Sequence, residues 1–279
     1  WAISTDMLNE KTHFLPNTDP FNLGWKALAV NISDIYAMGG VPKFALLAIA
    51  LPKVKLNWME KFSNGLFSCA KQYGVELIGG DTTKGSLCIS ICILGEVLKK
   101  NALLRSNAKK EDDIWVTGEL GLAALGLANL QKKIQLPQGL TKKAIGALEK
   151  PMLHSAIIEN MVKLSHSAID ISDGLIADLG HILEASKVGA DISLKDIPMN
   201  PWIKKNKLID IGLSGGDDYQ LLFTAPKKNR NKINLVSKMP SIKLTRIGSI
   251  KKDKRLKIID HKGMLYKLKK KGYDHFEAK

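Results

Sequence analysis

The residues of this chain best suited to chemistry are aspartates that follow apolar stretches and small residues. The stretches are residues 2–6, 30–34, 77–81, 169–173 and 213–217, and they end at Asp6, Asp34, Asp81, Asp173 and Asp217. A carboxylate in such a place loses its hydration and takes up a proton unless a positive group meets it. Several converging carboxylates also repel one another. Mg²⁺ relieves both costs, because carboxylates, waters and substrate phosphates are its usual ligands.

Asp34 lies in an apolar run, residues 27–40, that holds few polar side chains. Asn31 and Asp34 are three residues apart and therefore share one face of a helix. The pattern suits a pair of ligands, and it equally suits a helix-cap network or a single buried, hydrogen-bonded aspartate.

Asp81 follows a short strand that ends in two glycines, Gly79 and Gly80. We expect the carboxylate and the hydroxyls of residues 82–83 to lie at the carboxyl end of a sheet, where open α/β sheets bind ligands. The glycines would let backbone N–H groups approach a phosphate closely. A simple turn is the alternative.

Asp170 and Asp173 flank Ser172 just before a predicted helix at Leu175. Their carboxylates could hold a metal ion while free N–H groups of the helix N-terminus hold phosphate oxygens. Asp173 could instead be only the N-cap. A plain cap does not explain Asp170, which alternates with two isoleucines.

Several enzyme classes lack their motifs in this sequence. It contains no Gly-x-x-x-x-Gly-Lys-Ser/Thr, Gly-x-Gly-x-x-Gly, His-Glu-x-x-His or Gly-x-Ser-x-Gly. Carboxylates, glycine turns, hydroxyls and the isolated Arg105 remain. That set is typical of an enzyme that handles polyphosphate through several Mg²⁺ ions.

The composition argues against nucleic acid and membrane partners. Net charge is +15, yet 38 lysines accompany only four arginines, and aromatic residues make up 6%. Readers of bases and phosphates depend on arginine forks and aromatic stacking. The longest apolar run, residues 44–51, is too short to span a membrane. Three cysteines without metal spacing indicate a reducing cytoplasm.

Hydrophobic periodicity predicts an α/β (α+β) chain of two domains. We expect strands at residues 2–6, 43–51, 75–78 and 86–97, with helices at 20–38 and 57–73, the second opened by a capping box. A polar stretch at 101–113 marks the boundary, so the domains are 1–107 and 108–279. The second domain would alternate strands (114–117, 168–171, 190–194, 219–224, 243–250) with helices (120–131, 140–148, 154–164, 175–187, 228–237).

Taken together, the motifs resemble one known family. They are residues 4–6 with His13 and Phe14, 26–34 with 37–39, 77–83, 169–175, 213–219 and 272–276. In order and spacing they are similar to the thiamine-monophosphate kinase family, which groups with aminoimidazole ribonucleotide synthetase and selenophosphate synthetase. The resemblance implies a two-domain aminoimidazole ribonucleotide synthetase-like fold. It also implies a homodimer whose N-terminal domains join in a shared β-barrel, with the active site between the domains.

The resemblance implies transfer of the γ-phosphoryl group of ATP to thiamine monophosphate, giving thiamine diphosphate. It implies the Mg²⁺ ligands Ser4, Thr5, Asp6, Asp34, Asp81, Asp170 and Asp173. It implies the nucleotide contacts Gly80, Asp81, Arg105 and Ser172, and the substrate contacts His13, Asp217 and Tyr273. Asp6, Asp34, Asp81, Asp170 and Arg105 would be the catalytic set.

The predicted chemistry needs no strong general base, because the attacking phosphate oxygen is already anionic. Mg²⁺ and Arg105 would offset the repulsion between the two anionic reactants and align them for direct transfer without a phosphoenzyme.

Two departures from the family pattern are visible. A Gly-Asp-Asp motif precedes the first strand in the family, whereas this chain begins at Trp1. We therefore expect natural N-terminal sequence, and one Mg²⁺ ligand, to be missing. The family also carries Gly-Glu-Asp where this chain has Gly216, Asp217 and Asp218. Selenophosphate synthetase and a noncatalytic Mg-nucleotide-binding module are the rival interpretations.

Overall fold

The N-terminal half of the chain folds as a four-stranded sheet covered by two helices. The computed structural model describes residues 1–240, 242–269 and 272–273. The elements of this half are β1 (Ala2–Asn9), α1 (Pro20–Ala37), β2 (Val41–Leu51), α2 (Leu56–Tyr73), β3 (Glu76–Lys84) and β4 (Cys88–Glu96). The strand order is β1-β4-β2-β3, with β2 and β3 parallel and the other pairs antiparallel.

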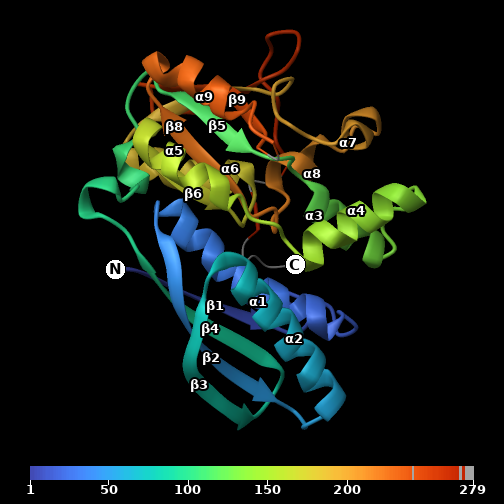
Figure 1. Cartoon of the computed structure of the whole chain (residues 1–279). Coiled ribbons are helices and arrows are strands. Elements are labelled where there is room, and N and C mark those ends of the chain that lie inside the picture. Colours follow the sequence, from blue (N-terminus) through green and yellow to red (C-terminus); the bar gives the residue numbers. More distant parts are fainter. Residues whose placement is uncertain (241, 270–271, 274–279) are drawn as a thin grey trace.

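Helix α1 begins and ends as its sequence predicts. The side chain of Asp19 accepts a hydrogen bond from the backbone N–H of Asn22, and Pro20 occupies the first turn. The helix stops before Gly39, which adopts a positive φ of 76°. Nearly all of its side chains are buried, because α1 lies between the two halves of the molecule (Figure 1).

Helix α2 crosses α1 at two glycines. A Cβ atom on Gly24 would lie 2.0 Å from the carbonyl oxygen of Phe62, and one on Gly65 would lie 1.8 Å from that of Phe21. The two backbones therefore touch at this crossing. The predicted capping box at the start of α2 is absent, because the helix begins at Leu56 and no side chain caps it.

One face of the four-stranded sheet packs on the helices and the other is exposed. Along β1 the buried Ala2 and Leu8 alternate with Ile3 and Met7, which are 59% and 56% exposed. Leu46 on β2 and Ile78 on β3 are also exposed. These side chains leave the outer face of the sheet apolar.

The segment after Ile78 differs from the prediction. Strand β3 does not end there in a turn but continues through Gly79, Gly80 and Asp81 as far as Lys84. It pairs with β2 along its whole length, with a register shift opposite residues 45–46. Since two consecutive glycines are typical of a turn, the pairing of this segment with β2 could not be read from local sequence.

The C-terminal half forms a six-stranded sheet of order β10-β7-β9-β5-β8-β6. Its strands are β5 (Asp113–Thr117), β6 (Ser167–Ile171), β7 (Gly189–Ser193), β8 (Gln220–Ala225), β9 (Leu244–Lys251) and β10 (Leu256–Ile259). Its helices are α3 (Leu122–Leu130), α4 (Gln138–Glu149), α5 (Ile158–Leu164), α6 (Leu175–Ser186), α7 (Pro201–Lys205), α8 (Ile209–Ser214) and α9 (Arg230–Val236).

Most predicted elements of this half are present within two or three residues of their expected bounds. The exceptions are α7, α8 and β10, which the sequence did not reveal. Short 3₁₀ turns, η1 (Lys99–Asn101) and η2 (Arg105–Asn107), connect the two halves, and a third (η3, Ser155–Ile157) precedes α5. Among the described residues, no helix is both long and apolar enough to cross a membrane.

The hydrophobic core is continuous from one half to the other. One cluster joins buried residues of α1, such as Ile32, to Trp115 of β5 and Phe223 of β8. Helix α1 contacts β1 and β4 on one side, and β6 and β8 on the other. A second cluster fills the opposite side of the large sheet, beneath α6. Residues on α1 can therefore face residues on β1 and on β6 at once.

Candidate active site

Asp6 on β1 and Asp34 on α1 form the N-terminal part of the site. The Ser4 hydroxyl donates a hydrogen bond to Asp34, and the Asn31 side-chain oxygen accepts one from the backbone N–H of Asp6. Burial, and then the charges of Asp34 and Asp173, raise the pKa of Asp6 to about 7. Asn31 and Asp34 thus face the same strand from one side of the helix.

Asp170 on β6 brings a third carboxylate from the other half of the molecule. It is almost fully buried, and the Ser33 hydroxyl on α1 donates a 2.7 Å hydrogen bond to its Oδ2. Burial and the charge of Asp34 raise the pKa of Asp170 well above its ordinary value. Three desolvated carboxylates that repel one another form a natural cation site.

Arg105 supplies positive charge to the edge of this cluster. It lies in the turn η2, and it lines a hollow of about 250 Å³ together with Ser4, Asp34 and Asp170. Burial raises the pKa of Asp34, while the Ser4 hydrogen bond and the Arg105 charge act in the opposite direction. The hollow is therefore bordered by the Arg105 guanidinium and by the carboxylates of Asp34 and Asp170.

Asp178, in the first turn of α6, is a functional candidate that sequence reasoning missed, and it contacts the loop between β6 and α6. The Oδ2 atom of Asp178 accepts hydrogen bonds from the backbone N–H groups of Ser172, Asp173 and Gly174, each at 3.1 Å. The N–H groups that we expected to be free for phosphate are therefore occupied. The signal was an aspartate in the first turn of a helix, which is too common a pattern to single out.

A cleft of about 770 Å³ joins this loop to β1. Its lining includes seven of the predicted residues, namely Thr5, Asp6, His13, Ser172, Asp173, Asp217 and Tyr273. Tyr273 is held beside the loop, since its backbone N–H donates to the Asp173 carbonyl at 3.0 Å. The remaining residues of the terminal motif, 274–276, lie outside the described residues.

Lys26 is a second candidate that the sequence did not single out. Its buried Nζ lies 2.9 Å from Oδ1 of Asp217 and donates to the carbonyl of His13 at 3.5 Å. The Tyr219 hydroxyl donates to the same Asp217 oxygen. One ammonium group therefore ties together two predicted substrate contacts, one from each half of the chain.

Asp81 does not join the cluster within one protomer. Asp6 pairs with Ile91, Ile91 with Leu47, and Leu47 with Gly80, so the line from Asp6 to Gly80 crosses the whole sheet. Three strand spacings separate the two edges by roughly 14 Å. Gly80 and Asp81 therefore lie at the far edge, where their side of β3 is exposed.

The Thr5 side chain also points away from Asp34. Thr5 alternates with Ser4 and Asp6 on β1, and its hydroxyl donates to the Ile91 carbonyl at 3.0 Å. Thr5 nevertheless borders the large cleft. The sequence placed Thr5 and Asp81 in the cluster because a motif shows spacing along the chain but not which face of a strand a residue occupies.

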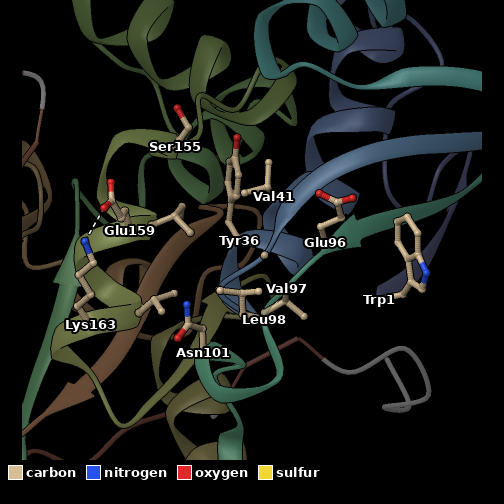
Figure 2. Close-up of a pocket in the computed structure, with 14 residues that line it drawn as sticks. Trp1, Tyr36, Val41, Glu96, Val97, Leu98, Asn101, Ser155, Glu159 and Lys163 are labelled. Atoms are coloured by element: carbon tan, nitrogen blue, oxygen red, sulfur yellow. Dashed lines mark hydrogen bonds and ion pairs between the residues drawn. The ribbon is translucent and has the colours of Figure 1, made fainter.

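A separate hollow of about 670 Å³ contains none of the predicted site residues. Trp1, Tyr36, Glu96 and Ser155 line it, as Figure 2 shows. Its lining includes no aspartate. The carboxylate cluster and the large cleft beside it therefore remain the candidate active site.

Comparison with known proteins shows which family the chain is similar to. The family models "AIR synthase related protein, N-terminal domain" and "AIR synthase related protein, C-terminal domain" match residues 1–97 and 109–261. The thiamine-monophosphate kinase of Buchnera aphidicola from Schizaphis graminum is 44% identical over 99% of this chain and 87% of its own length. That of Escherichia coli K12 is 42% identical over 99% and 86%.

The chain belongs to the thiamine-monophosphate kinase family.

Solved structures of the family share the fold. Thiamine-monophosphate kinase from Stenotrophomonas maltophilia has a TM-score of 0.88 and 35% identity, covering 95% of this chain and 86% of its own. A structure described as AaThiL complexed with AMPPCP and TMP has a TM-score of 0.86 and 32% identity, covering 98% and 86%. The predicted two-domain, mixed α/β fold of the AIR synthase type is thus confirmed.

Proposed function

We propose that this chain phosphorylates thiamine monophosphate to thiamine diphosphate with ATP as the donor. The relatives named above are thiamine-monophosphate kinases, and AaThiL was solved with AMPPCP and TMP. The observation that carries the proposal is the convergence of Asp6, Asp34 and Asp170 from both halves of the fold beside a cleft of about 770 Å³. Two anionic reactants need such a cation-binding centre between them.

The carboxylates fit magnesium. Asp170 is buried and Asp6 and Asp34 are partly buried, and they repel one another and have raised pKa values. A divalent cation would therefore relieve both the desolvation and the repulsion. Asp6, Asp34, Asp170 and Asp173, with Ser4 nearby, would hold it. When bound, Mg²⁺ would neutralise phosphate charge and orient the phosphoryl group.

The chain's own residues divide between donor and acceptor. Arg105 borders the hollow beside Asp34 and would bind nucleotide phosphate, as would the side chain of Ser172. His13, Asp217 and Tyr273 line the other part of the cleft and would position thiamine monophosphate. No base is needed, so we infer direct in-line transfer. A trapped phosphoaspartate or phosphohistidine would contradict that step.

ADP release tests the activity. We expect turnover with thiamine monophosphate and Mg²⁺, none above background with thiamine or selenide, and a loss of turnover in Asp170→Asn. Glu184→Gln removes an exposed carboxylate from α6 and is the matched control. Turnover only with a different acceptor would contradict the assignment as a thiamine-monophosphate kinase. Nucleotide binding without any turnover would favour the noncatalytic alternative.

We also infer a homodimer that shares each active site between two chains. The open sheet face carries exposed Ile3, Met7, Leu46 and Ile78, and β1 and β3 are the sheet's two edges. If β3 of one chain joined β1 of its partner, the sheets would close into a barrel and leave no bare edge. Asp81 would then lie beside its partner's cleft.

Complementation of two inactive variants tests the shared site. Asp6→Asn and Asp81→Asn are each expected to be inactive. Mixed dimers would carry one doubly altered site and one intact site, so equal mixing should restore about a quarter of wild-type activity. If both ligands came from one chain, mixing would restore nothing, and the kinase proposal would still stand.

The remaining assignments follow from composition. We infer a cytoplasmic protein, because Cys69, Cys88 and Cys92 are all free thiols. The lysine-rich surface gives no reason to propose a nucleic acid partner.

We keep 1–107 and 108–279 as the division of the chain into domains, with the division falling at the turn η2.

A further inference from the structure

The loop of residues 171–174 is fixed by hydrogen bonds on both sides of its backbone. Three consecutive N–H groups, from Ser172 to Gly174, donate to Asp178. On the other side, the carbonyls of residues 171, 172 and 173 accept from the backbone N–H groups of residues 219, 217 and 273, at 2.8, 2.8 and 3.0 Å. The main chain therefore has little capacity left for a ligand, and the side chains of Ser172 and Asp173 face the cleft.

Three converging N–H groups at a helix N-terminus normally attract an anion. Here a carboxyl group of the protein fills that position, since Asp178 is 2% exposed and accepts from all three N–H groups. A phosphate that bound there would compete with the carboxylate of Asp173 for the cation. With the position filled, the loop offers a carboxylate to a cation instead of N–H groups to a phosphate.

We propose that Asp178 is a positioning residue that makes this loop a cation-binding element by occupying its anion site. The inference rests on the proposed function, because it concerns how the phosphotransfer site holds its metal. Asp178 acts through Asp173 and does not touch the reactants. Gly174 supports the same arrangement, since its φ is 113° and a Cβ atom there would lie 2.7 Å from the Ser214 carbonyl carbon.

Two substitutions distinguish the hydrogen bonds made by the Asp178 side chain from its negative charge. Asp178→Ala removes every acceptor, whereas Asp178→Asn keeps a carbonyl oxygen that can accept hydrogen bonds from these N–H groups without the charge. We expect Asp178→Ala to weaken Mn²⁺ binding, measured by electron paramagnetic resonance without substrates, by about tenfold or more. We expect Asp178→Asn to bind Mn²⁺ nearly as wild type does. Glu184→Gln on the same helix serves as the control for lost charge.

Kinetics and amide exchange complete the test. The Mg²⁺ concentration for half-maximal ADP release should rise in Asp178→Ala, while KM for thiamine monophosphate should stay near the wild-type value. Hydrogen exchange of residues 172–174 should be slow in the wild-type protein and in Asp178→Asn. If Asp178→Ala does not fold, exchange in the wild-type chain still decides, since fast exchange there would overturn the proposal.

Two further outcomes would overturn it. Wild-type Mn²⁺ affinity in folded Asp178→Ala would show that the loop needs no support. Equal loss in Asp178→Asn and Asp178→Ala would make Asp178 a ligand in its own right, since ligand atoms of Asp173, Asp178 and His181 lie within 4.8 Å of one another. Mn²⁺ binding and amide exchange do not depend on the acceptor, so failure of the kinase assay would be distinguishable.

Discussion

At the scale of single residues, the site is a set of carboxylates held at an electrostatic cost. Burial is the largest cause of the raised pKa values of Asp6, Asp170 and Asp178, and repulsion from neighbouring aspartates, chiefly Asp34 and Asp173, adds to it. Structural carboxylates normally stay near water or meet a lysine or arginine. Asp218 shows that burial also occurs outside the cation cluster, where no metal would relieve it.

Asp218 provides a pH prediction that does not involve the metal. Burial raises its pKa to about 7, although the backbone N–H of Gly121 donates to its Oδ2 at 2.7 Å. Between about pH 4 and pH 7 the folded chain keeps a proton that the unfolded chain has released. The contribution of Asp218 to the free energy of unfolding therefore falls as pH rises through that range, and it levels off above about pH 7.

The variant Asp218→Asn should lose this dependence. We expect urea titrations of the wild-type protein to show a free energy of unfolding that decreases between pH 5 and pH 8. In Asp218→Asn this decrease should be smaller by about 2 kcal/mol. The Glu184→Gln variant should follow the wild-type slope. An unchanged slope in Asp218→Asn would show that Asp218 is ionised throughout the range.

At the scale of elements, the crossing of α1 and α2 depends on the absence of side chains. Gly65→Ala would force its Cβ against the Phe21 carbonyl at 1.8 Å and push the helices apart. We expect a loss of about 3 kcal/mol or more, measured by denaturant titration, because overpacking against backbone cannot be relieved by a rotamer change.

Gly146 on α4 is the matched control for that crossing. A Cβ atom there meets nothing within 4 Å. Gly146→Ala should therefore stabilise the protein by about 0.5–1 kcal/mol through better helix propensity. If both alanine variants had similar stability, contact at the crossing would not be what Gly65 provides.

The elements also show what sequence can and cannot predict here. Helix α1, with Asp19 and Pro20 at its start, was predicted almost to the residue, because capping and periodicity are local signals. The continuation of β3 beyond Ile78 was not predicted, since Gly79 and Gly80 are typical of turns and only pairing with β2 extends the strand. The structure brings Asp34 and Asp170 together and leaves Asp81 at the far edge of the sheet. Strand pairing decides both placements, and no local motif reveals it.

At the scale of the whole molecule, the exposed sheet face predicts assembly. Leu46→Glu would place a charge at the centre of the proposed interface, and the two-fold axis repeats the change on both chains. We expect the dissociation constant of the dimer to rise by at least about 100-fold, observed by analytical ultracentrifugation. ADP release should fall with it.

Leu235 on α9 serves as the comparison for that experiment. It is 63% exposed but lies on the other half of the molecule. Leu235→Glu should remain dimeric and active. A dimer that survives Leu46→Glu would mean that the chains meet through another surface, or that the open face has a different partner.

The position of helix α1 determines how the molecule unfolds, because both halves of the molecule pack against it. Its buried side chains belong to one cluster with Trp115 and Phe223. Unfolding of either half would therefore expose the hydrophobic core of the other, so the two halves should unfold together. Calorimetry should accordingly record a single endotherm with equal van't Hoff and calorimetric enthalpies. Two separable endotherms would mean that the halves are independent neighbours, and residues 1–107 expressed alone would then remain soluble.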